Sequence, residues 1–258
     1  MTEHVIVDKS GGVLTLTLNR PDKKNALTGE MYAALGDAID ASGDDPSVRC
    51  ILIQANGDMF TAGNDLGAFA AVNSGETPAG ERRGGSALIM ALARAKTPIV
   101  AAVNGRAVGV GTTMLLHCDL VFLAEDALLT TPFVNLALVP EAASSMLLPT
   151  RIGHARAFSM FVLGEAVDAR KAEAWGIANA VVPAAELRAR ARAAADAIAA
   201  KPPASVAITK ALMRDAQAYL DRIQEEGGHF TNQLKSPEAR EAFAAFREKR
   251  APDFGKVS

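Results

Sequence analysis

The sequence predicts an α/β fold, and three observations indicate it. An alternating apolar and polar segment surrounds a glycine turn near the N-terminus, three short apolar runs separated by helical segments follow, and the chain becomes alanine-rich and helical after residue 183. Apolar runs linked by helices are typical of parallel strands joined by crossovers. The 258 residues are enough for one large domain, or for a domain with an appendage.

The first two predicted elements are a hairpin and a helix. Residues 4–19 alternate around Ser10-Gly11-Gly12, which is the pattern of a β-hairpin. Thr28 can cap a helix that runs to about Ala41. The apolar stripe of this helix comprises Met31, Ala34, Leu35 and Ile39.

Short buried strands and then helices make up the rest of the chain. The predicted parallel strands are residues 49–55, 98–103 and 120–124. Residues 72–85, rich in glycine, serine and charge, predict a mobile loop or a poorly ordered helix start of the kind that often borders a ligand site. We expect a boundary near residue 197, between a core at 1–196 and an all-helical region at 197–258 that packs on the core or on a neighbouring subunit.

Composition narrows the classes of function. The chain is 49% hydrophobic and 22% charged, as in a globular protein, and its net charge of −2 predicts no nucleic-acid partner. No run reaches the roughly 18 apolar residues of a membrane span. Two cysteines, Cys50 and Cys118, and the absence of a signal-like N-terminus predict a cytoplasmic protein without disulfides.

Glu141 is the single ionisable residue between 127 and 150, an otherwise apolar stretch. If Glu141 is buried, desolvation raises its pKa toward neutrality, which suits a general base that takes a proton and returns it. Alternatively, Pro140 begins a helix and Glu141 follows it, where a negative charge favours the helix dipole. The segment alone leaves both interpretations open.

The chain also resembles itself. Residues 51–64 overlay residues 99–112 without a gap, which matches Asn56-Gly57 to Asn104-Gly105 and Gly63 to Gly111. Each copy reads as a strand, a turn and a glycine-rich entry to a helix, where free N–H groups can hold an anion. Two such units could direct donors at one oxyanion, although Asn-Gly pairs are also common simple turns.

Other chemistries have weaker patterns. The histidines show no paired metal spacing, so we expect no metal site; they are His4, His117, His154 and His229. Ser144 and Ser145 lack an evident base and should lie in the helix after Glu141. Some apolar residues could line an acyl pocket or belong to the core, namely Phe69, Met90, Met114 and Phe133.

Several longer motifs together resemble the crotonase, or enoyl-CoA hydratase/isomerase, superfamily, and they span nearly the whole chain. They are residues 18–27 (LNRPDKKNAL), 60–66 (FTAGNDL), 101–127, 132–149, 148–153, 172–183 (AEAWGIANAVVP) and 246–254 (FREKRAPDF). This resemblance implies a spiral of repeated strand-strand-helix units with a C-terminal helical region that builds homotrimers, often paired into hexamers. It implies an acyl-CoA thioester substrate and no separate cofactor.

The resemblance also implies roles for individual residues. The thioester oxygen would lie between the backbone N–H groups of Asn64 and Val110. Lys249 could reach the CoA phosphates, across a subunit boundary. The other residues that would contact substrate or CoA are Lys24, Ala26, Ala62, Asp65, Leu66, Gly109 and Phe133.

Departures from the family pattern bear on the reaction. Family hydratases carry two glutamates, and the matching positions here are Thr113 and Phe133. Glu141 instead falls where a delta-3, delta-2-enoyl-CoA isomerase subgroup carries its catalytic glutamate. The resemblance then implies that Glu141 moves a proton from C2 to C4 of a 3-enoyl-CoA. The alternatives are hydration, isomerisation of a ring-derived acyl-CoA, or a non-catalytic acyl-CoA-binding or RNA-binding role, of which the slightly acidic charge disfavours RNA.

Overall fold

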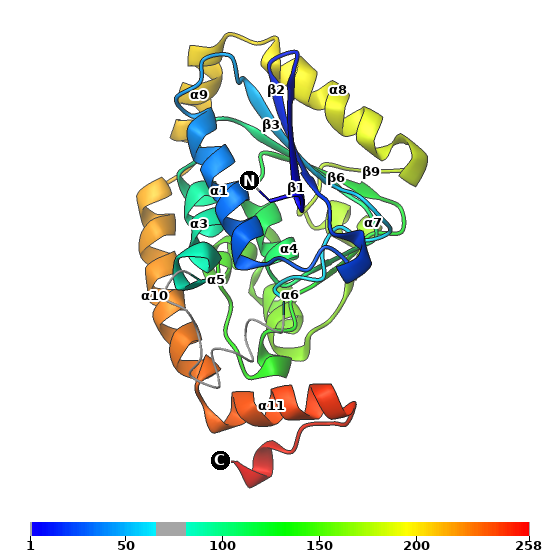
Figure 1. The fold of residues 1–258 in the computed structure, drawn as a ribbon, viewed down its shortest axis with the longest axis vertical. Coiled ribbons are helices and arrows are strands. Elements are labelled where there is room, and N and C mark those ends of the chain that lie inside the picture. Colours follow the sequence, from blue (N-terminus) through cyan, green and yellow to red (C-terminus); the bar gives the residue numbers. More distant parts are fainter. Residues whose placement is uncertain (1, 66–80, 258) are drawn as a thin grey trace.

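The computed structural model describes residues 2–65 and 81–257, with side chains from residue 86 onward in the second range. It confirms the α/β class, with two sheets and helices around them (Figure 1). The larger sheet has the order β1 (Val5–Ser10), β2 (Val13–Leu18), β3 (Cys50–Ala55), β4 (Ile99–Val103), β6 (Leu120–Ala124) and β9 (Ala180–Val182). The smaller sheet contains β5 (Arg106–Val108), β7 (Leu128–Thr130) and β8 (Val167–Asp168).

The chain alternates between these two sheets, and this produces the spiral. From β2 to β9 the neighbours in the larger sheet are parallel, and β5 and β7 are parallel in the smaller one. The chain therefore passes from β4 to β5 and, one turn later, from β6 to β7. The predicted strands at 49–55, 98–103 and 120–124 are confirmed, whereas the strands of the smaller sheet, two or three residues long, were too short to be predicted by periodicity.

The predicted hairpin and first helix are also confirmed. β1 and β2 pair antiparallel, and Gly11 and Gly12 between them have φ of 60° and 81°, as a two-residue hairpin turn requires. Helix α1 (Gly29–Ser42) is capped by the Thr28 side chain, which accepts a hydrogen bond from the Met31 amide at 3.3 Å.

The central strands of the larger sheet are buried on both faces. In β4, Ile99 and Ala101 belong to the main core, whereas Val100 and Ala102 face a second cluster with helix α8 (Leu187–Ala199). Residue 197, where we expected a boundary, lies within α8. This helix packs on the sheet, so the expected boundary falls inside an element of the core.

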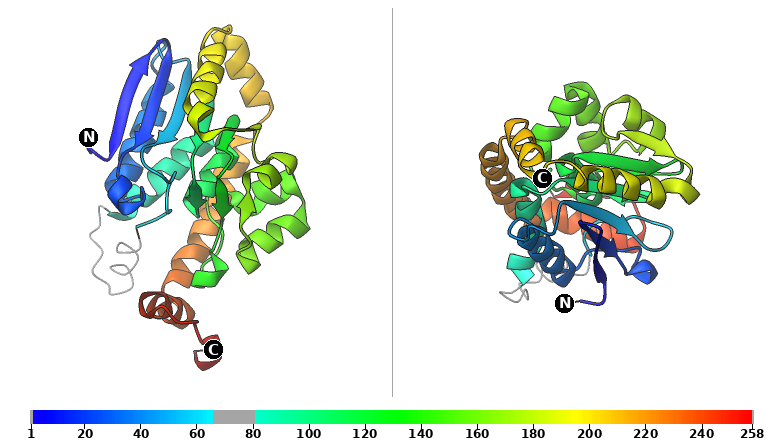
Figure 2. Two further views of the ribbon diagram at one scale, coloured as in Figure 1. Left: turned by 90° about the vertical axis from the view of Figure 1, so that its right-hand side faces the viewer. Right: turned by 90° about the horizontal axis from the view of Figure 1, so that it is seen from above.

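The remaining helices complete the molecule. They are α3 (Glu81–Arg94), α4 (Val110–Thr113), α5 (Ser144–Ile152), α6 (His154–Phe158), α7 (Ala169–Ala174), α9 (Pro203–Leu212), α10 (Ala216–Leu234) and α11 (Pro237–Glu248). Helix α10 packs beside α3, and α11 crosses the end of the molecule opposite α8 (Figures 1 and 2). Of the segment predicted as a mobile loop, residues 72–80 lie outside the described residues and 81–85 begin α3. No helix in the described ranges is long and apolar enough to cross a membrane.

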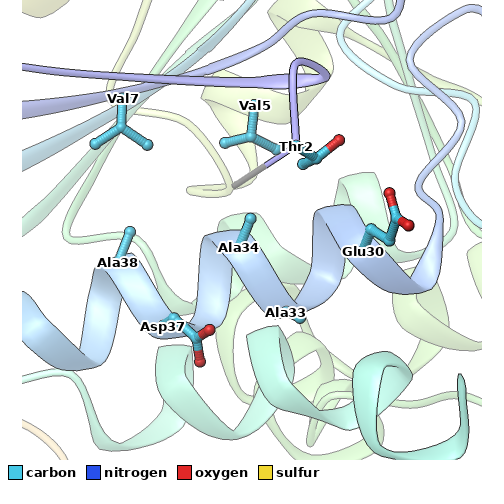
Figure 3. Close-up of a pocket in the computed structure, with 8 residues that line it drawn as sticks. All are labelled: Thr2, Val5, Val7, Glu30, Ala33, Ala34, Asp37 and Ala38. Carbon is cyan, nitrogen blue, oxygen red and sulfur yellow. The ribbon is translucent and has the colours of Figure 1, made fainter. Parts of the chain in front are cut away.

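A surface pocket of about 600 Å³ lies between β1 and α1 (Figure 3). Its lining is Thr2, Val5, Val7, Glu30, Ala33, Ala34, Asp37 and Ala38. None of these is a predicted site residue, so the candidate site is built from other parts of the chain.

Candidate active site

Parallel pairing brings the two glycine-rich turns side by side. Thr61 forms a parallel bridge with Ala107, and the Val108 amide donates to the Thr61 carbonyl oxygen at 3.1 Å. Asn64 is three residues after Thr61, and Val110 is three residues after Ala107. Because the two segments are parallel, Asn64 and Val110 lie beyond the same end of this pairing. The two predicted oxyanion donors are therefore equivalent positions in adjacent turns.

The gapless sequence overlay holds for the strands but not for these turns. Ile51 pairs with Ile99, as the overlay requires, whereas the Thr61–Ala107 bridge is shifted by two residues. With that shift Gly63 corresponds to Gly109, not to Gly111. Gly63 and Gly109 have φ of 86° and 56°, a left-handed conformation that glycine adopts readily, and each directly precedes a predicted oxyanion donor.

The amides of Asn64 and Val110 are available for a ligand. Val110 is the first residue of α4, so its N–H has no partner within the helix. Neither amide donates a hydrogen bond to another group within residues 2–65 and 81–257. At Gly63 the backbone approaches so closely that an added Cβ would lie 2.7 Å from the Val108 carbonyl oxygen.

A buried asparagine that sequence reasoning did not single out holds the first turn. Asn25 is fully buried, and its side chain accepts from the Arg20 amide at 2.7 Å and donates to the Asn56 and Met59 carbonyl oxygens at 2.8 Å each. The Thr61 hydroxyl then donates to the Asn25 carbonyl and accepts from the Gly63 amide. The signal for Asn25 was its place in the motif at 18–27.

Most of the predicted CoA-contacting residues lie together around the same turn. The Ala62 amide donates to the Lys24 carbonyl oxygen at 2.9 Å, and the Arg20 guanidinium bridges the Ala26 carbonyl and the Asp65 carboxylate at 3.1 and 2.7 Å. Leu66 lies outside the described residues. Lys249 is exposed at the end of α11 and belongs to a different element.

Glu141 does not begin a helix, so the helix-dipole interpretation is wrong. Helix α5 starts at Ser144, and Ala142 and Ala143 between them have φ of 61° and 55°. The charge at the start of α5 is instead Glu226 of α10, whose carboxylate accepts from the Ala143 and Ser145 amides. Left-handed alanines cost about 1–2 kcal/mol each, so this turn requires support from its surroundings.

The Glu141 carboxyl is buried, with 8% of the residue exposed. Burial raises its pKa to about 7, and the negative charge of Glu226 acts in the same direction. The Thr113 hydroxyl opposes this shift by donating to Glu141 Oε1 at 2.5 Å. A carboxyl with a pKa near 7 can both accept and return a proton at neutral pH.

Tyr32, which sequence reasoning missed, lies beside the first glycine-rich turn. Its hydroxyl donates to Asn64 Oδ1 at 2.5 Å, and the residue is 3% exposed. Burial, together with the negative charge of Glu141, raises the pKa of Tyr32 well above its usual value, so the phenol stays protonated. Its one sequence signal is its place beside Met31 in α1.

Two further residues near these turns, Phe133 and His117, are apolar or neutral. Phe133 lies against the Gly109 turn and packs on Phe161, with ring centroids 6.2 Å apart. Burial lowers the pKa of His117 to about 3. Its Nε2–H donates to the Ala142 carbonyl at 2.7 Å, while Nδ1 accepts from Arg214. Among the described residues, no group of three or more His, Cys, Asp and Glu side chains could hold a metal ion.

Comparison with known proteins decides the family. The family profile described as enoyl-CoA hydratase/isomerase matches residues 8–257. The chain belongs to this family. Its structure is similar to that of an enoyl-CoA hydratase/isomerase from Pseudoalteromonas atlantica, with a TM-score of 0.91, 43% identity and coverage of 98% of this chain and 100% of the other.

Curated relatives of this enoyl-CoA hydratase/isomerase family member carry several names. A 1,2-epoxyphenylacetyl-CoA isomerase from Escherichia coli is 32% identical over 98% of this chain and 99% of its own length. A carnitinyl-CoA dehydratase from Proteus mirabilis is 34% identical with the same coverage. Rat enoyl-CoA delta isomerase 2 is 33% identical over 86% of this chain and 57% of its own length. The family therefore supports an acyl-CoA isomerase or hydratase reaction.

Tyr32→Phe should lower acyl-CoA turnover by about fivefold, the equivalent of one hydrogen bond of roughly 1 kcal/mol. The phenyl ring keeps the packing of α1, while Asn64 loses the donor that orients its side chain. The control is Tyr219→Phe, because Tyr219 is the other tyrosine of the chain. Equal kcat values for the two variants would contradict a role for the Tyr32 hydroxyl.

Proposed function

We propose that this protein is a delta-3, delta-2-enoyl-CoA isomerase with Glu141 as its single acid/base. The observation that carries the proposal is the hydrogen bond from Thr113 to Glu141. Thr113 occupies the position of the first hydratase glutamate, so Glu141 reaches the place where that carboxylate would project. In this proposal the base is Glu141, which comes from a different segment of the chain than Thr113.

The proposed reaction moves one proton across one face of the substrate. The Glu141 carboxylate removes a proton from C2 of the 3-enoyl-CoA, and the electrons delocalise onto the thioester oxygen. The amides of Asn64 and Val110 stabilise this enolate. Protonated Glu141 then delivers the proton to C4, which forms the 2-trans-enoyl-CoA and restores the carboxylate.

Two features support isomerisation over hydration. Adding water across a double bond requires activation of the water and protonation of the adjacent carbon, which two carboxylates would share. The second hydratase position holds Phe133, an apolar side chain against the Gly109 turn. The nearest other buried carboxylate, Glu226, is bound to two backbone amides.

The pH dependence follows from the buried carboxyl. Because burial raises the pKa of Glu141 to about 7 and the base acts as the carboxylate, kcat/KM should rise as pH increases through about 7 and level off above it. Below that pH the rate should fall about tenfold per pH unit. This is checked by measuring kcat/KM at each pH in an assay whose coupling enzyme is in excess. A value of kcat/KM that stays constant between pH 5 and 8 would contradict the prediction.

We also propose that CoA lies along Lys24, Ala26, Ala62 and Asp65, and that the chain assembles as a homotrimer or as a hexamer of two trimers in the cytoplasm. Helix α9 supports the assembly because Ile208, Leu212 and Met213 are 60%, 83% and 78% exposed. Light scattering after gel filtration should give three or six times 26.9 kDa. A monomeric mass would contradict this part of the proposal.

A spectrophotometric assay tests the reaction itself. The protein is incubated with a series of 3-enoyl-CoA substrates of increasing length and, separately, with 2-enoyl-CoA, and the products are identified. We expect 2-enoyl-CoA from the first set and no 3-hydroxyacyl-CoA from the second. Faster hydration than isomerisation, or turnover of a ring-derived acyl-CoA alone, would replace the proposal with one of those reactions.

A further inference from the structure

The turn that follows Glu141 has a conformation that alanine rarely adopts. Ala142 and Ala143 are consecutive left-handed residues, and both are buried. Such backbone persists only where neighbouring groups over-determine it, and it is common at functional sites. The neighbours of this turn therefore control where the Glu141 side chain points.

The strongest support for the turn comes from Glu226, in the middle of α10. Its carboxylate accepts from the Ala143 amide at 2.6 Å and from the Ser145 amide at 2.9 Å. Glu226 is 5% exposed, although it lies within the C-terminal helices. On the other side of the turn, the neutral His117 ring donates to the Ala142 carbonyl. The turn is thus held from two elements remote in sequence.

We propose that Glu226 is a positioning residue for Glu141, which fixes the turn after Glu141 through its two amide hydrogen bonds. The proposal rests on the proposed function in one respect, namely that Glu141 is the base. Buried glutamates are rare unless paired, and Glu226 is paired here with backbone amides rather than with a cation. Burial raises the pKa of Glu226, and the hydrogen bonds from Ser145 and Ala143 together with the charge of Arg222 oppose this shift.

The charge of Glu226 acts on Glu141 in a known direction. It raises the pKa of Glu141, in addition to the larger effect of burial. Other titratable or charged groups lie on the elements that pack around the two carboxyls. They are Tyr32 in α1, His117 before β6, Arg151 in α5, Arg214 just before α10 and Arg222 in α10. Of these groups, Tyr32 and His117 are neutral, because burial raises the pKa of the phenol and lowers that of the imidazole.

Two variants separate the geometric and the electrostatic roles. Glu226→Asp retains the charge but shortens the side chain, so the amide contacts weaken. Glu226→Gln removes the charge and places an N–H₂ group against one of the two amides. The matched control is Glu225→Gln, because Glu225 is the adjacent residue and makes an exposed ion pair with Arg222.

Two readouts are measured for each variant. The first is kcat with a 3-enoyl-CoA. The second needs no substrate: an infrared titration of the protonated carboxyl band that is absent from Glu141→Gln. We expect both Glu226 variants to lose kcat by at least about tenfold through misplacement of the base. The titration midpoint of Glu141 should move to lower pH in Glu226→Gln and move less in Glu226→Asp.

The outcomes that overturn the proposal are specific. A Glu226→Gln protein with the midpoint of wild type and the kcat of Glu225→Gln rules it out. If Glu226→Gln does not fold, as judged by circular dichroism, wild-type kcat in Glu226→Asp rules it out. If the wild-type protein isomerises no 3-enoyl-CoA, the proposed function fails, but the infrared titration still decides whether Glu226 controls Glu141.

Discussion

Glu141→Gln should lower kcat for 3-enoyl-CoA isomerisation by about 10²- to 10⁴-fold, the usual contribution of a general base. Glutamine has nearly the shape of glutamate, and its carbonyl oxygen can still accept the Thr113 hydrogen bond. It cannot accept a proton from C2. The Kd for a saturated acyl-CoA should therefore change little, and the two quantities are measured by the isomerase assay and by calorimetry.

The control for this variant is Glu125→Gln, which removes an exposed carboxylate outside the site. It should retain wild-type kcat and Kd. Substantial activity in Glu141→Gln would exclude Glu141 as the single base. Loss of binding together with kcat would instead indicate that Glu141 shapes the acyl pocket.

Val110→Pro should lower kcat by about 10²- to 10³-fold, the typical effect of losing one oxyanion donor. Proline has no N–H, and the first position of a helix is where proline is best tolerated. Val110 occupies that position in α4. The substitution therefore removes the donor while it preserves most of the fold, and melting temperature together with kcat checks both effects.

The matched control for the donor is Val110→Ala, which changes the side chain but keeps the amide. Because Val110 is 1% exposed, this variant should lose some stability but retain kcat within a few fold. Equal losses of kcat in the proline and alanine variants would show that the side chain, and not the N–H group, matters at this position.

Short-range patterns in the sequence were sufficient to predict much of the fold. Residues 4–19 form a hairpin because alternation and adjacent glycines act over a few residues, and Thr28 caps α1 for the same reason. The three parallel strands were visible because each is an apolar run of ordinary length. The three-residue strands β5 and β7 were not visible, since their pairing depends on partners elsewhere in the spiral.

For the candidate site, too, some features could be predicted from the sequence and others could not. The sequence by itself singled out Glu141 as a candidate, through its isolation in an apolar stretch, and Asn64 and Val110 as candidates, through family motifs. It did not reveal the two-residue shift between the glycine turns, because the register of Thr61 against Ala107 is a property of the pairing. The apparent repeat therefore matched Gly63 to the wrong glycine.

What only the tertiary structure decided is the environment of Glu141, the candidate base. Thr113 contacts Glu141, and the charge of Glu141 acts on Tyr32. The carboxylate that binds the amides at the start of α5 is Glu226, whereas one interpretation of the sequence had placed Glu141 at a helix start. These partners come from α4, α1 and α10. Burial and hydrogen bonding between such distant segments set the pKa and direction of a side chain, and no periodicity along the chain encodes them.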